Sequence, residues 1–421
     1  MAKAIVLLLV PLAVAARGEE VRIATYNSSL SPDAESGQES LPVKLAKPGD
    51  DRANRVAEII QRVNPDILLV NEFNWDAEGA AADAFAKNYL CVGHDAAHTG
   101  TPSTPIAFAY RFLPTGASSP FNTGLPSGKD LDHNGQSKGA GDDYGFGQFP
   151  GQYGLLLLSK YPIKFDEVRT FQSFRWRDMP GNLIPTEFYS DDEGHALRLS
   201  SKSHWDVPID VHGHTLHVLA SHPTPPVFDG DEDRNGQRNA DEIRFWRDYV
   251  TPGKGTYIYD DQEFAAAGNT APARPHGGLT PGASFVILGD QNADPVDGAS
   301  RPNAANQLLK SPRINTSLTP SGTGGPQASK LHGGRNTYHT GNPENDTAAF
   351  GKSGNLRVDY VLPSTDLKLL DGRIYWFADN EPLFKLVTHG SFPSDHRAVY
   401  VDVELPDANA DPHSTAPTDG R

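Results

Sequence analysis

The chain has 421 residues, long enough to bury a large hydrophobic core and longer than most single domains. Its 37 Lys and Arg residues against 53 Asp and Glu residues give a net charge of −16. Proteins that hold nucleic acid tightly by its phosphates are usually basic, so this charge argues against tight, non-specific binding of duplex DNA. It fits attraction of divalent cations, or simply solubility in salt. The one cysteine, Cys91, excludes an internal disulfide and is expected to be a small core residue rather than a nucleophile.

The N-terminus has the pattern of a secretory signal peptide. Lys3 precedes an apolar run from Ala4 to Ala15 that is too short to span a bilayer and is closed by small residues. Residues 1–17 are therefore predicted to be a cleaved signal peptide, and the mature protein is expected to be secreted or periplasmic, with no transmembrane segment. A single domain with long loop insertions is predicted over 18–405, and a disordered tail over 406–421 because that segment has almost no apolar residue beyond alanine.

The elements that follow alternate between strand-like and helical patterns. The first helical spacing covers residues 50–65 and the second covers 239–250. Apolar runs predict strands over 21–27, 66–73, 153–160, 216–222, 285–292, 356–362 and 398–405. This alternation predicts a mixed α/β layered domain. The long loops between the elements are expected to line a site or carry specificity.

Polar side chains stand at or near the ends of these apolar runs. In the sequence FVILGDQN, Asp290 and Asn292 are two residues apart and so point the same way from an extended chain. Each such residue alone is weak support for a site, because an Asn after a strand is usually a turn residue and a buried Asp can simply accept backbone hydrogen bonds. The full set comprises Asn27, Asn71, Glu72, His222, Asp290, Asn292, Asp359, Asp395 and His396.

Together these residues favour one shared cation site, because burying several charges is costly unless they are paired or coordinated. Carboxylates and an Asn carbonyl are hard oxygen ligands that suit Mg²⁺, Mn²⁺ or Ca²⁺. A cation there would neutralise a phosphate, while the two histidines would supply acid, base or phosphate-binding groups. The pattern therefore indicates metal-assisted phosphoester hydrolysis.

The ordered motifs TYN, NEF, YGLLLLSKYPI, SHP, GDQN, RVDYVL and SDHRAV resemble those of the endonuclease/exonuclease/phosphatase superfamily, also called DNase I-like. The resemblance covers residues 21–405. It implies a four-layer αββα sandwich in which two packed mixed β-sheets are flanked by helices. The site would lie at one edge of the two sheets.

The resemblance also implies roles for the residues that match these motifs. Glu72 would be the principal metal ligand, with Asn27 beside it, and Mg²⁺ or Mn²⁺ would be the active-site ion. Asp395 would be a further carboxylate on the metal or phosphate side. The catalytic set would be His222, Asp290, Asn292, Asp359 and His396, with Asp290 and Asn292 orienting the attacking water, Asp359 orienting His396, and His222 helping the leaving group or binding phosphate.

A second signal is a possible structural calcium site. The segment DEDRNGQRNADE matches a twelve-residue calcium loop with Asp231, Asp233, Asn235 and Glu242 as ligands and a glycine at the turn. Substrate contacts, or a solvated acidic loop, are the alternatives. The shorter DLDHNG, residues 130–135, has the same first offsets, but its twelfth position is Gly141 rather than a carboxylate.

Four further residues are candidate substrate contacts. Basic and aromatic side chains gather in LRLSSKSHWDVPI, where a second phosphate or a headgroup could be received and stacked on an indole. A sheet edge with ordinary charges is the alternative. The candidates in this segment are Arg198, Lys202 and Trp205. The fourth candidate, Arg238, lies in the segment 231–242 and belongs to the alternative in which that segment contacts substrate.

The expected partner is a phosphoester substrate, and no stable protein partner is implied. The first hypothesis is an exported phosphodiesterase or nuclease. The second is an exported phosphatase or a lipid-headgroup phosphodiesterase for small substrates. The third, a catalytically silent binding domain, is disfavoured because the whole constellation is present. Acidity and long loops favour a small or single-stranded substrate over duplex DNA.

Overall fold

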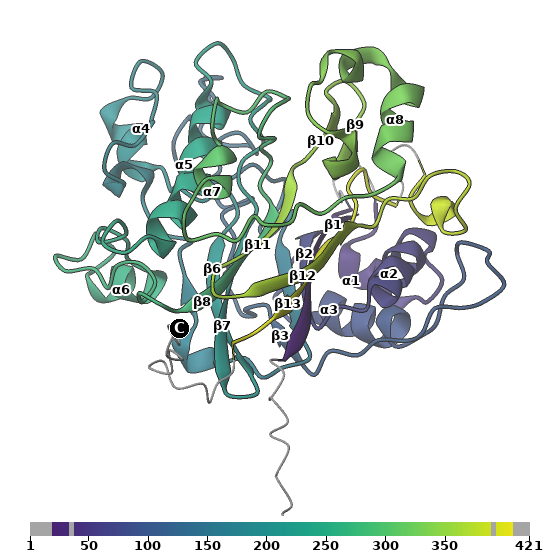
Figure 1. The fold of residues 1–421 in the computed structure, drawn as a ribbon. Helices are drawn as coiled ribbons and strands as arrows, with labels where there is room; N and C mark the ends of the chain where they lie inside the picture. Colours follow the sequence, from purple (N-terminus) through teal and green to yellow (C-terminus); the bar gives the residue numbers. More distant parts are fainter. Residues whose placement is uncertain (1–18, 33–37, 389–392, 407–421) are drawn as a thin grey trace, which may run out of the picture.

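The computed structural model describes residues 19–32, 38–388 and 393–406 (Figure 1). The predicted signal peptide lies outside these residues, and so does all but residue 406 of the predicted tail. Within the described ranges, no helix combines the length and the apolar character needed to cross a membrane.

Two large mixed sheets form the centre of the molecule. The six-stranded sheet has the order β12-β13-β1-β2-β4-β3, and the five-stranded sheet has the order β11-β8-β7-β6-β5. The strands of the first sheet are β1 (Glu20–Leu30), β2 (Ile67–Phe73), β3 (Tyr110–Phe112), β4 (Leu155–Ser159), β12 (Lys368–Ile374) and β13 (Val399–Glu404). Those of the second are β5 (Arg169–Thr170), β6 (His204–Val211), β7 (His214–Ser221), β8 (Ser284–Asp290) and β11 (Asp359–Pro363), and a small hairpin pairs β9 (Ala348–Phe350) with β10 (Gly354–Leu356).

Helices cover the outer faces of both sheets, which gives the expected αββα layering (Figure 1). On the side of the six-stranded sheet lie α1 (Leu41–Ala46), α2 (Asp51–Val63) and α3 (Ala80–Phe85). On the side of the five-stranded sheet lie α4 (Asp191–Ala196), α5 (Arg234–Val250), α6 (Asp261–Ala266) and α7 (Asn306–Leu309). Helix α8 (Gly324–His332) packs beside the small hairpin.

The alternation of side chains along β8 explains why this strand is apolar throughout. Val286 and Leu288 belong to the core between the two sheets, whereas Phe285 and Ile287 belong to the cluster beneath α5. Successive side chains of a strand point to opposite faces, so a strand covered on both faces must be apolar at every position. The strand is buried along its whole length.

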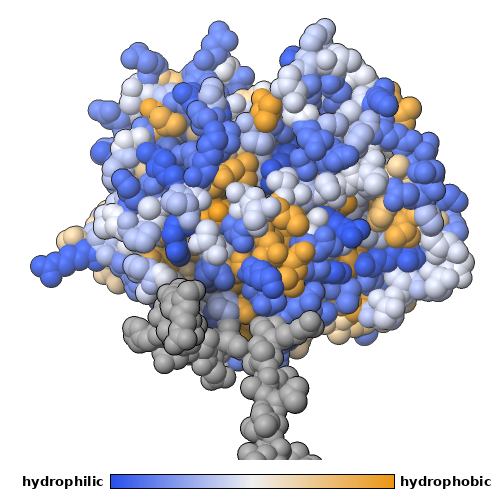
Figure 2. Space-filling model, in the orientation of Figure 1, coloured by the Kyte–Doolittle hydropathy of each residue, from blue (hydrophilic) through white to orange (hydrophobic). Residues whose placement is uncertain are grey.

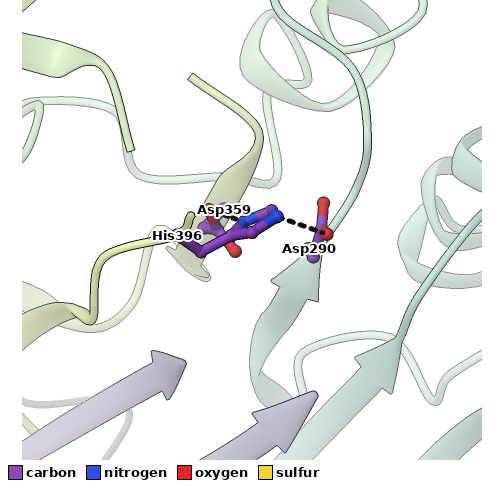
Figure 3. Close-up of side chains that lie close together, drawn as sticks. All are labelled: Asp290, Asp359 and His396. Atoms are coloured by element: carbon purple, nitrogen blue, oxygen red, sulfur yellow. Dashed lines mark hydrogen bonds and ion pairs between the residues drawn. The ribbon is translucent and has the colours of Figure 1, made fainter. Parts of the chain in front are cut away.

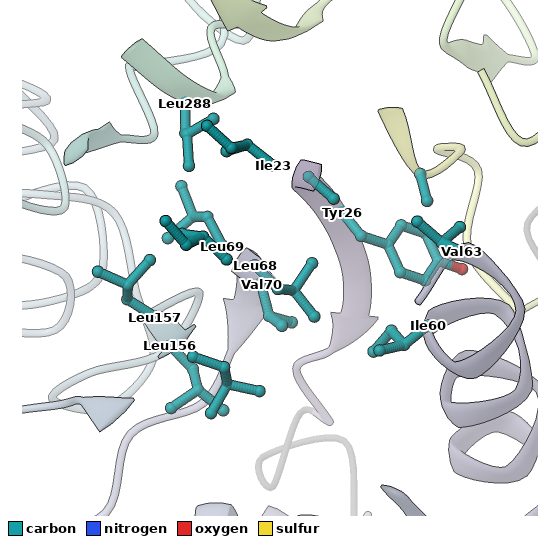
Figure 4. Packing of buried hydrophobic residues seen from close by; sticks show 14 of the residues in the cluster. Ile23, Tyr26, Ile60, Val63, Leu68, Leu69, Val70, Leu156, Leu157 and Leu288 are labelled. Atoms are coloured by element: carbon teal, nitrogen blue, oxygen red, sulfur yellow. The ribbon is translucent and has the colours of Figure 1, made fainter. Parts of the chain in front are cut away.

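Side chains of β1, in the six-stranded sheet, likewise point alternately into the core between the sheets and toward the covering helices (Figure 4). Ile23 points toward Leu288 of the five-stranded sheet, while Tyr26 points toward Ile60 and Val63 of α2. Helix α2 presents this apolar face because its buried residues recur at helical spacing. Its ends are defined by the Asp50 side chain, which accepts the Ala53 N–H, and by Asn64 in the left-handed conformation.

The face drawn in Figure 2 is largely hydrophilic, with apolar side chains gathered near its middle. A pocket of about 270 Å³ is lined by side chains of both sheets, including Val361 of β11 and Val401 of β13. Neither histidine of the predicted site lines this pocket.

All seven predicted strands and both predicted helices are present. The segment 356–362 is divided between β10 and β11, and α5 begins at Arg234, before the predicted start at 239. One expectation is wrong: Cys91 is exposed rather than part of the core. The π-helical turn over Ala86–Leu90 ends at this residue and leaves its side chain outside.

Candidate active site

The polar residues predicted from the strand ends lie together at one end of the two packed sheets. Asn27 and Glu72 lie near the ends of β1 and β2, and Asp290 is the last residue of β8. Asp359 begins β11 and lies directly opposite Asp290 in that antiparallel pair. The packing of one sheet on the other therefore brings distant parts of the chain to one site.

Asp290 is the centre of this cluster. Its Oδ2 atom accepts a hydrogen bond from Nδ2 of Asn27 at 3.0 Å. The same oxygen lies 3.4 Å from Nε2 of His222 and 3.6 Å from Nε2 of His396. Its other oxygen, Oδ1, accepts the backbone N–H of Asn292 at 2.8 Å. This buried carboxylate is thus surrounded by donors from β1, from the segments after β7 and β8, and from the segment before β13.

His396 bridges the two carboxylates of the β8–β11 pair (Figure 3). Its Nδ1 atom lies 2.9 Å from Oδ2 of Asp359, and its Nε2 atom faces Asp290. The three residues each offer a ligand atom within 4.8 Å of the others, and all three are buried. Oδ1 of Asp359 is buried without a hydrogen-bond partner, which leaves acceptor capacity unused in the site.

The charges and burial of Asp290, Asp359 and His396 favour a protonated histidine beside ionised carboxylates. Burial alone would lower the pKa of His396, but the carboxylates of Asp359 and Asp290 raise it well above its usual range. Burial raises the pKa of Asp359 to about 6. Asp290 is different: burial acts to raise its pKa, but the charge of His396 and the hydrogen bond from His222 hold it well below its usual range. Near neutral pH the site therefore contains an imidazolium beside two carboxylates.

Glu72 stands in an unusual backbone conformation. Its φ is 56°, although it lies within strand β2. Non-glycine residues at positive φ are uncommon, and such strain gathers at functional sites. The register between β1 and β2 shifts at the same place, between Asn27 and Leu30. The shift holds the Glu72 carboxylate 3.2 Å from Nδ2 of Asn27 and 3.3 Å from Oγ of Ser31.

His222 and Lys202 supply the rest of the buried polar groups. Burial, together with the charge of Lys202, lowers the pKa of His222, so this imidazole is neutral. Its Nδ1 atom is buried without a hydrogen-bond partner. Burial also lowers the pKa of Lys202, while the carboxylates of Glu242, Asp290 and Glu72 oppose that shift. Lys202, predicted as a substrate contact, thus lies within the electrostatic reach of the site.

Two of the predicted residues, Asp395 and Asn292, lie at the margin of the active site. The carboxylate of Asp395 is 36% exposed, and its Oδ1 lies 4.0 Å from Nε2 of His396. The side chain of Asn292 donates to the carbonyl of Pro223 at 3.1 Å, and its φ is 51°. The site thus has a buried centre and a partly open carboxylate beside it.

Sequence reasoning missed Ser394 and the structural role of Asn71. Oγ of Ser394 donates to the Asn27 carbonyl at 2.8 Å and accepts the backbone N–H of His396 at 3.1 Å, so it fixes both segments. Asn71 joins the sheets, because its Nδ2 donates to the carbonyl of Ser221 at 3.3 Å. The SDH motif, which begins at Ser394, could have pointed to this serine. The role of Asn71 depends on sheet packing, which no local sequence pattern shows.

The donor set fits a hard divalent cation. Glu72, Asp290, Asp359 and Asp395 bring four carboxylates to a site whose nearby cationic side chains are Lys202, His396 and Arg397, so negative charge is in excess. The unused buried oxygen of Asp359 points to the same conclusion. Oxygen-rich sites of this kind suit Mg²⁺ or Mn²⁺.

The predicted calcium loop over 231–242 is wrong. Helix α5 begins at Arg234, so Asn235 and Glu242 lie about 10 Å apart along the helix axis, too far to share one ion. Asp233 instead pairs with Arg301 at 2.6 Å, from Oδ2 to Nη1. Buried Glu242 accepts the backbone N–H groups of Ser201 and Thr224, and the remaining predicted ligand, Asp231, lies before the helix.

Two of the predicted substrate contacts are structural residues. Trp205 is fully buried between the sheets and packs edge-on against Phe112 with ring centroids 4.9 Å apart, so it offers no stacking face. Arg238 directs its Nε and Nη2 donors to backbone carbonyls, including those of Leu199 and Tyr144. Trp205 was predicted as a contact from the basic residues near it in sequence, and Arg238 from its segment following His222. Neither signal says anything about the direction of a side chain.

Arg198 lies with its guanidinium 4.0 Å over the ring of Tyr144, and its Nη1 donates to Oδ1 of Asn122. Burial lowers its pKa. Its role toward substrate stays a prediction.

The sequence pattern of the Endonuclease/Exonuclease/phosphatase family matches residues 24–396. The chain belongs to this family. The match includes every residue of the cluster around Asp290, and it makes the chain a phosphoester hydrolase. A comparison with curated proteins found none that matches.

Solved structures similar to this family member include an endonuclease/exonuclease/phosphatase from Beutenbergia cavernae, with 17% identity, 92% of this chain and 72% of that chain covered, and a TM-score of 0.48. Sphingomyelinase C from Streptomyces griseocarneus has 14% identity, coverages of 91% and 99%, and a TM-score of 0.46. A mutant beta toxin from Staphylococcus aureus with bound magnesium ions has 15% identity, coverages of 92% and 100%, and a TM-score of 0.41.

Proposed function

We propose that this protein is an exported, divalent-metal-dependent phosphodiesterase, of nuclease or small-diester type, that hydrolyses its substrate by attack of water. The observation that carries the proposal is the convergence of Asn27, His222 and His396 on the Asp290 carboxylate at the edge of both sheets. Membership of the family supports the hydrolase chemistry.

The protein's own residues divide the work as follows. Asp290, which stays ionised, accepts a hydrogen bond from the attacking water and orients it, with Asn292 held beside it. His396, held as a cation by Asp359, contacts a phosphoryl oxygen and stabilises the negative charge that develops there. A raised pKa favours this role over that of a base, because an imidazolium has no free lone pair. His222, whose Nε2 lies 3.4 Å from the Asp290 oxygen that His396 also approaches, binds phosphate or assists the leaving group.

Glu72 and Asn27 would hold the active-site cation, with Asp395 as a further carboxylate on its open side. When bound, Mg²⁺ or Mn²⁺ would neutralise the charge of the phosphate. Ser31 and Ser394 fix the two ligand-bearing segments through their hydroxyl groups. The cation is needed because the site otherwise repels an anionic substrate.

The excess of carboxylates favours a diester over a monoester. A phosphodiester carries one negative charge, whereas a phosphate monoester carries close to two at neutral pH, so repulsion by the site is weaker for the diester. The net charge of −16 favours small or single-stranded substrates over duplex DNA for the same reason. Lys202 and Arg198 would contact a flanking part of the substrate.

Hydrolysis of bis-p-nitrophenyl phosphate and of p-nitrophenyl phosphate, each with Mg²⁺, Mn²⁺, Ca²⁺ or EDTA, tests the proposal. We expect metal-dependent preference for the diester, followed by activity on RNA, single-stranded DNA or a lipid-headgroup diester. Preference for the monoester would make the protein a phosphatase and overturn the diester assignment. Export is tested separately by the intact mass of the mature protein, which should lack residues 1–17.

A further inference from the structure

A second cluster of carboxylates lies in the long segment between β3 and β4, apart from the active site. Asp130, Asp132 and Asp142 each offer a carboxylate oxygen, and these oxygens lie within 4.8 Å of one another. None of the three contacts Asp290 or His396 in the described part of the chain.

Asp142 gives this cluster a feature that exposed acidic groups lack. Its side chain is 1% exposed, and its Oδ1 accepts the backbone N–H of Leu131 at 2.8 Å. Its Oδ2 atom is buried and has no hydrogen-bond partner. A buried carboxylate oxygen without a partner is costly, and more so beside two other carboxylates.

No ion pair of the described residues reaches these three carboxylates. The nearest lysine along the chain, Lys129, is paired with Asp192 on α4. Asp130 and Asp132 accept hydrogen bonds from the backbone N–H groups of Asn134 and Gly135, but no cationic side chain of the described residues pairs with any of the three charges. This uncompensated charge, beside the unpartnered Oδ2 of Asp142, points to a bound cation.

The third carboxylate of the cluster comes from a residue next to the twelfth position of the calcium-loop pattern. Asp130, Asp132 and Asn134 stand at the alternating offsets of a calcium loop, but the twelfth position is Gly141. The next residue, Asp142, takes its place in the structure. At Gly141 an added Cβ would lie 2.4 Å from Oδ2 of Asp132, so the chain returns very close to the first ligands at this point.

We propose that Asp130, Asp132 and Asp142 bind a Ca²⁺ ion that stabilises this loop and is separate from the catalytic cation. The donors are all hard oxygens, and Ca²⁺ accepts irregular oxygen cages that Mg²⁺, with its strict octahedral geometry, does not. The loop is joined to the active-site region at its base, where the Asn122 N–H donates to the carbonyl of Lys202 at 2.8 Å.

The test uses the full chain stripped of metal with EDTA and carrying Glu72→Gln, which weakens the catalytic site so that the loop site can be measured alone. Ca²⁺ is titrated by calorimetry, and the melting temperature is recorded with and without Ca²⁺. The same measurements are made after adding Asp132→Asn, at a half-buried ligand, or Asp166→Asn, an exposed residue far along the chain that gives the same change in charge.

We expect one Ca²⁺ per chain and a raised melting temperature in the Glu72→Gln protein and in its Asp166→Asn derivative. Asp132→Asn should weaken Ca²⁺ binding by about tenfold or more and remove the rise in melting temperature. Asp142→Asn should do the same, and if that variant does not fold, the Asp132→Asn result still decides. No Ca²⁺ uptake by the Glu72→Gln protein, equal uptake after Asp132→Asn, or equal affinity for Mg²⁺ would overturn the proposal.

Discussion

The Nδ1 atom of His396 lies 2.9 Å from Oδ2 of Asp359, and both side chains are buried. The two residues are 37 positions apart, on β11 and on the segment that leads into β13. An aspartate in this position fixes the orientation of the ring and stabilises its protonated form. The free Nε2 side of His396 is thereby directed at Asp290, where the proposed chemistry takes place.

Replacing the two partners should separate their contributions. His396→Ala should lower kcat for diester hydrolysis by about 10²- to 10⁴-fold, because the group that faces the phosphate is lost. Asp359→Asn should cost less, about tenfold or more, because the ring remains but loses its charged partner. Steady-state kinetics measures both, with exposed His332→Ala as the control. Near-normal turnover of His396→Ala would contradict the assignment of this histidine.

The second prediction concerns the metal. Glu72→Gln should raise the Mn²⁺ concentration needed for half-maximal activity by about tenfold or more, because a charged ligand is replaced by a neutral one. Activity titrations after EDTA treatment measure this change. Glu39→Gln, at an exposed carboxylate paired with Lys47, is the control and should leave the metal dependence unchanged. Equal metal dependence in the Glu72→Gln variant would exclude Glu72 as a ligand.

Gly289, immediately before Asp290, should tolerate no side chain. Its φ is +132°, and an added Cβ would lie 2.0 Å from the carbonyl oxygen of Ser221 on the neighbouring strand. Gly289→Ala should therefore destabilise the fold by about 3 kcal/mol or more, measured from the denaturant midpoint. Gly351→Ala, where an added Cβ meets nothing within 4 Å, should change stability by less than about 0.5 kcal/mol. Similar effects of the two substitutions would show that the close approach at Gly289 relaxes.

Stability should fall in mild acid because of His204. This side chain is buried between Oγ of Ser200 at 2.8 Å and the carbonyl of Glu242 at 3.2 Å, and burial lowers its pKa to about 4. Between its unfolded pKa of about 6.5 and this value, the unfolded chain binds a proton that the folded chain does not. The contribution of His204 is thus complete above pH 6.5 and is lost as the pH falls toward 4, by about 3 kcal/mol in total.

Chemical unfolding between pH 4 and pH 7 tests this prediction. The His204→Gln variant should be less stable than wild type at pH 7 but should lose less stability on acidification. The exposed His332→Gln variant should follow the wild-type pH dependence. An unchanged pH slope in His204→Gln would assign the acid sensitivity to other groups.

Much of this fold was predictable from the sequence because its central strands are covered on both faces. Continuous apolar runs such as Phe285 to Leu288 result from that burial, and the polar residues that end them are conspicuous by contrast. The layered α/β class and the clustering of the strand-end residues could therefore be inferred. The seven predicted strands supply most of both sheets.

Strand β6 shows what local patterns miss. His204, Asp206 and Pro208 make it resemble a surface segment, yet it is buried. Asp206 is satisfied by Nδ1 of His217 at 2.8 Å and by the hydroxyl of Tyr249 at 2.6 Å. These partners come from the next strand and from α5, and their proximity depends on the completed fold. The same limit explains the errors at Trp205 and Arg238, whose directions are set by packing.

The calcium loop predicted over 231–242 is wrong for a related reason. The stretch from Asp231 has the better sequence match, but helix α5 begins inside it. The poorer match from Asp130 gathers three carboxylates because the chain returns at Gly141. A spacing pattern assumes that the backbone takes a loop conformation, and helix propensity decides whether it does.

The most direct test of the account is the rate of bis-p-nitrophenyl phosphate hydrolysis with Mn²⁺ by wild type and Asp290→Asn, with circular dichroism and thermal unfolding as checks of the fold. Asn27, His222 and His396 all direct a nitrogen at the Asp290 carboxylate, so its neutralisation should reduce kcat/KM by about 10²-fold or more while the protein remains folded. A folded Asp290→Asn variant with activity close to that of wild type would show that hydrolysis takes place elsewhere and would contradict the proposed site.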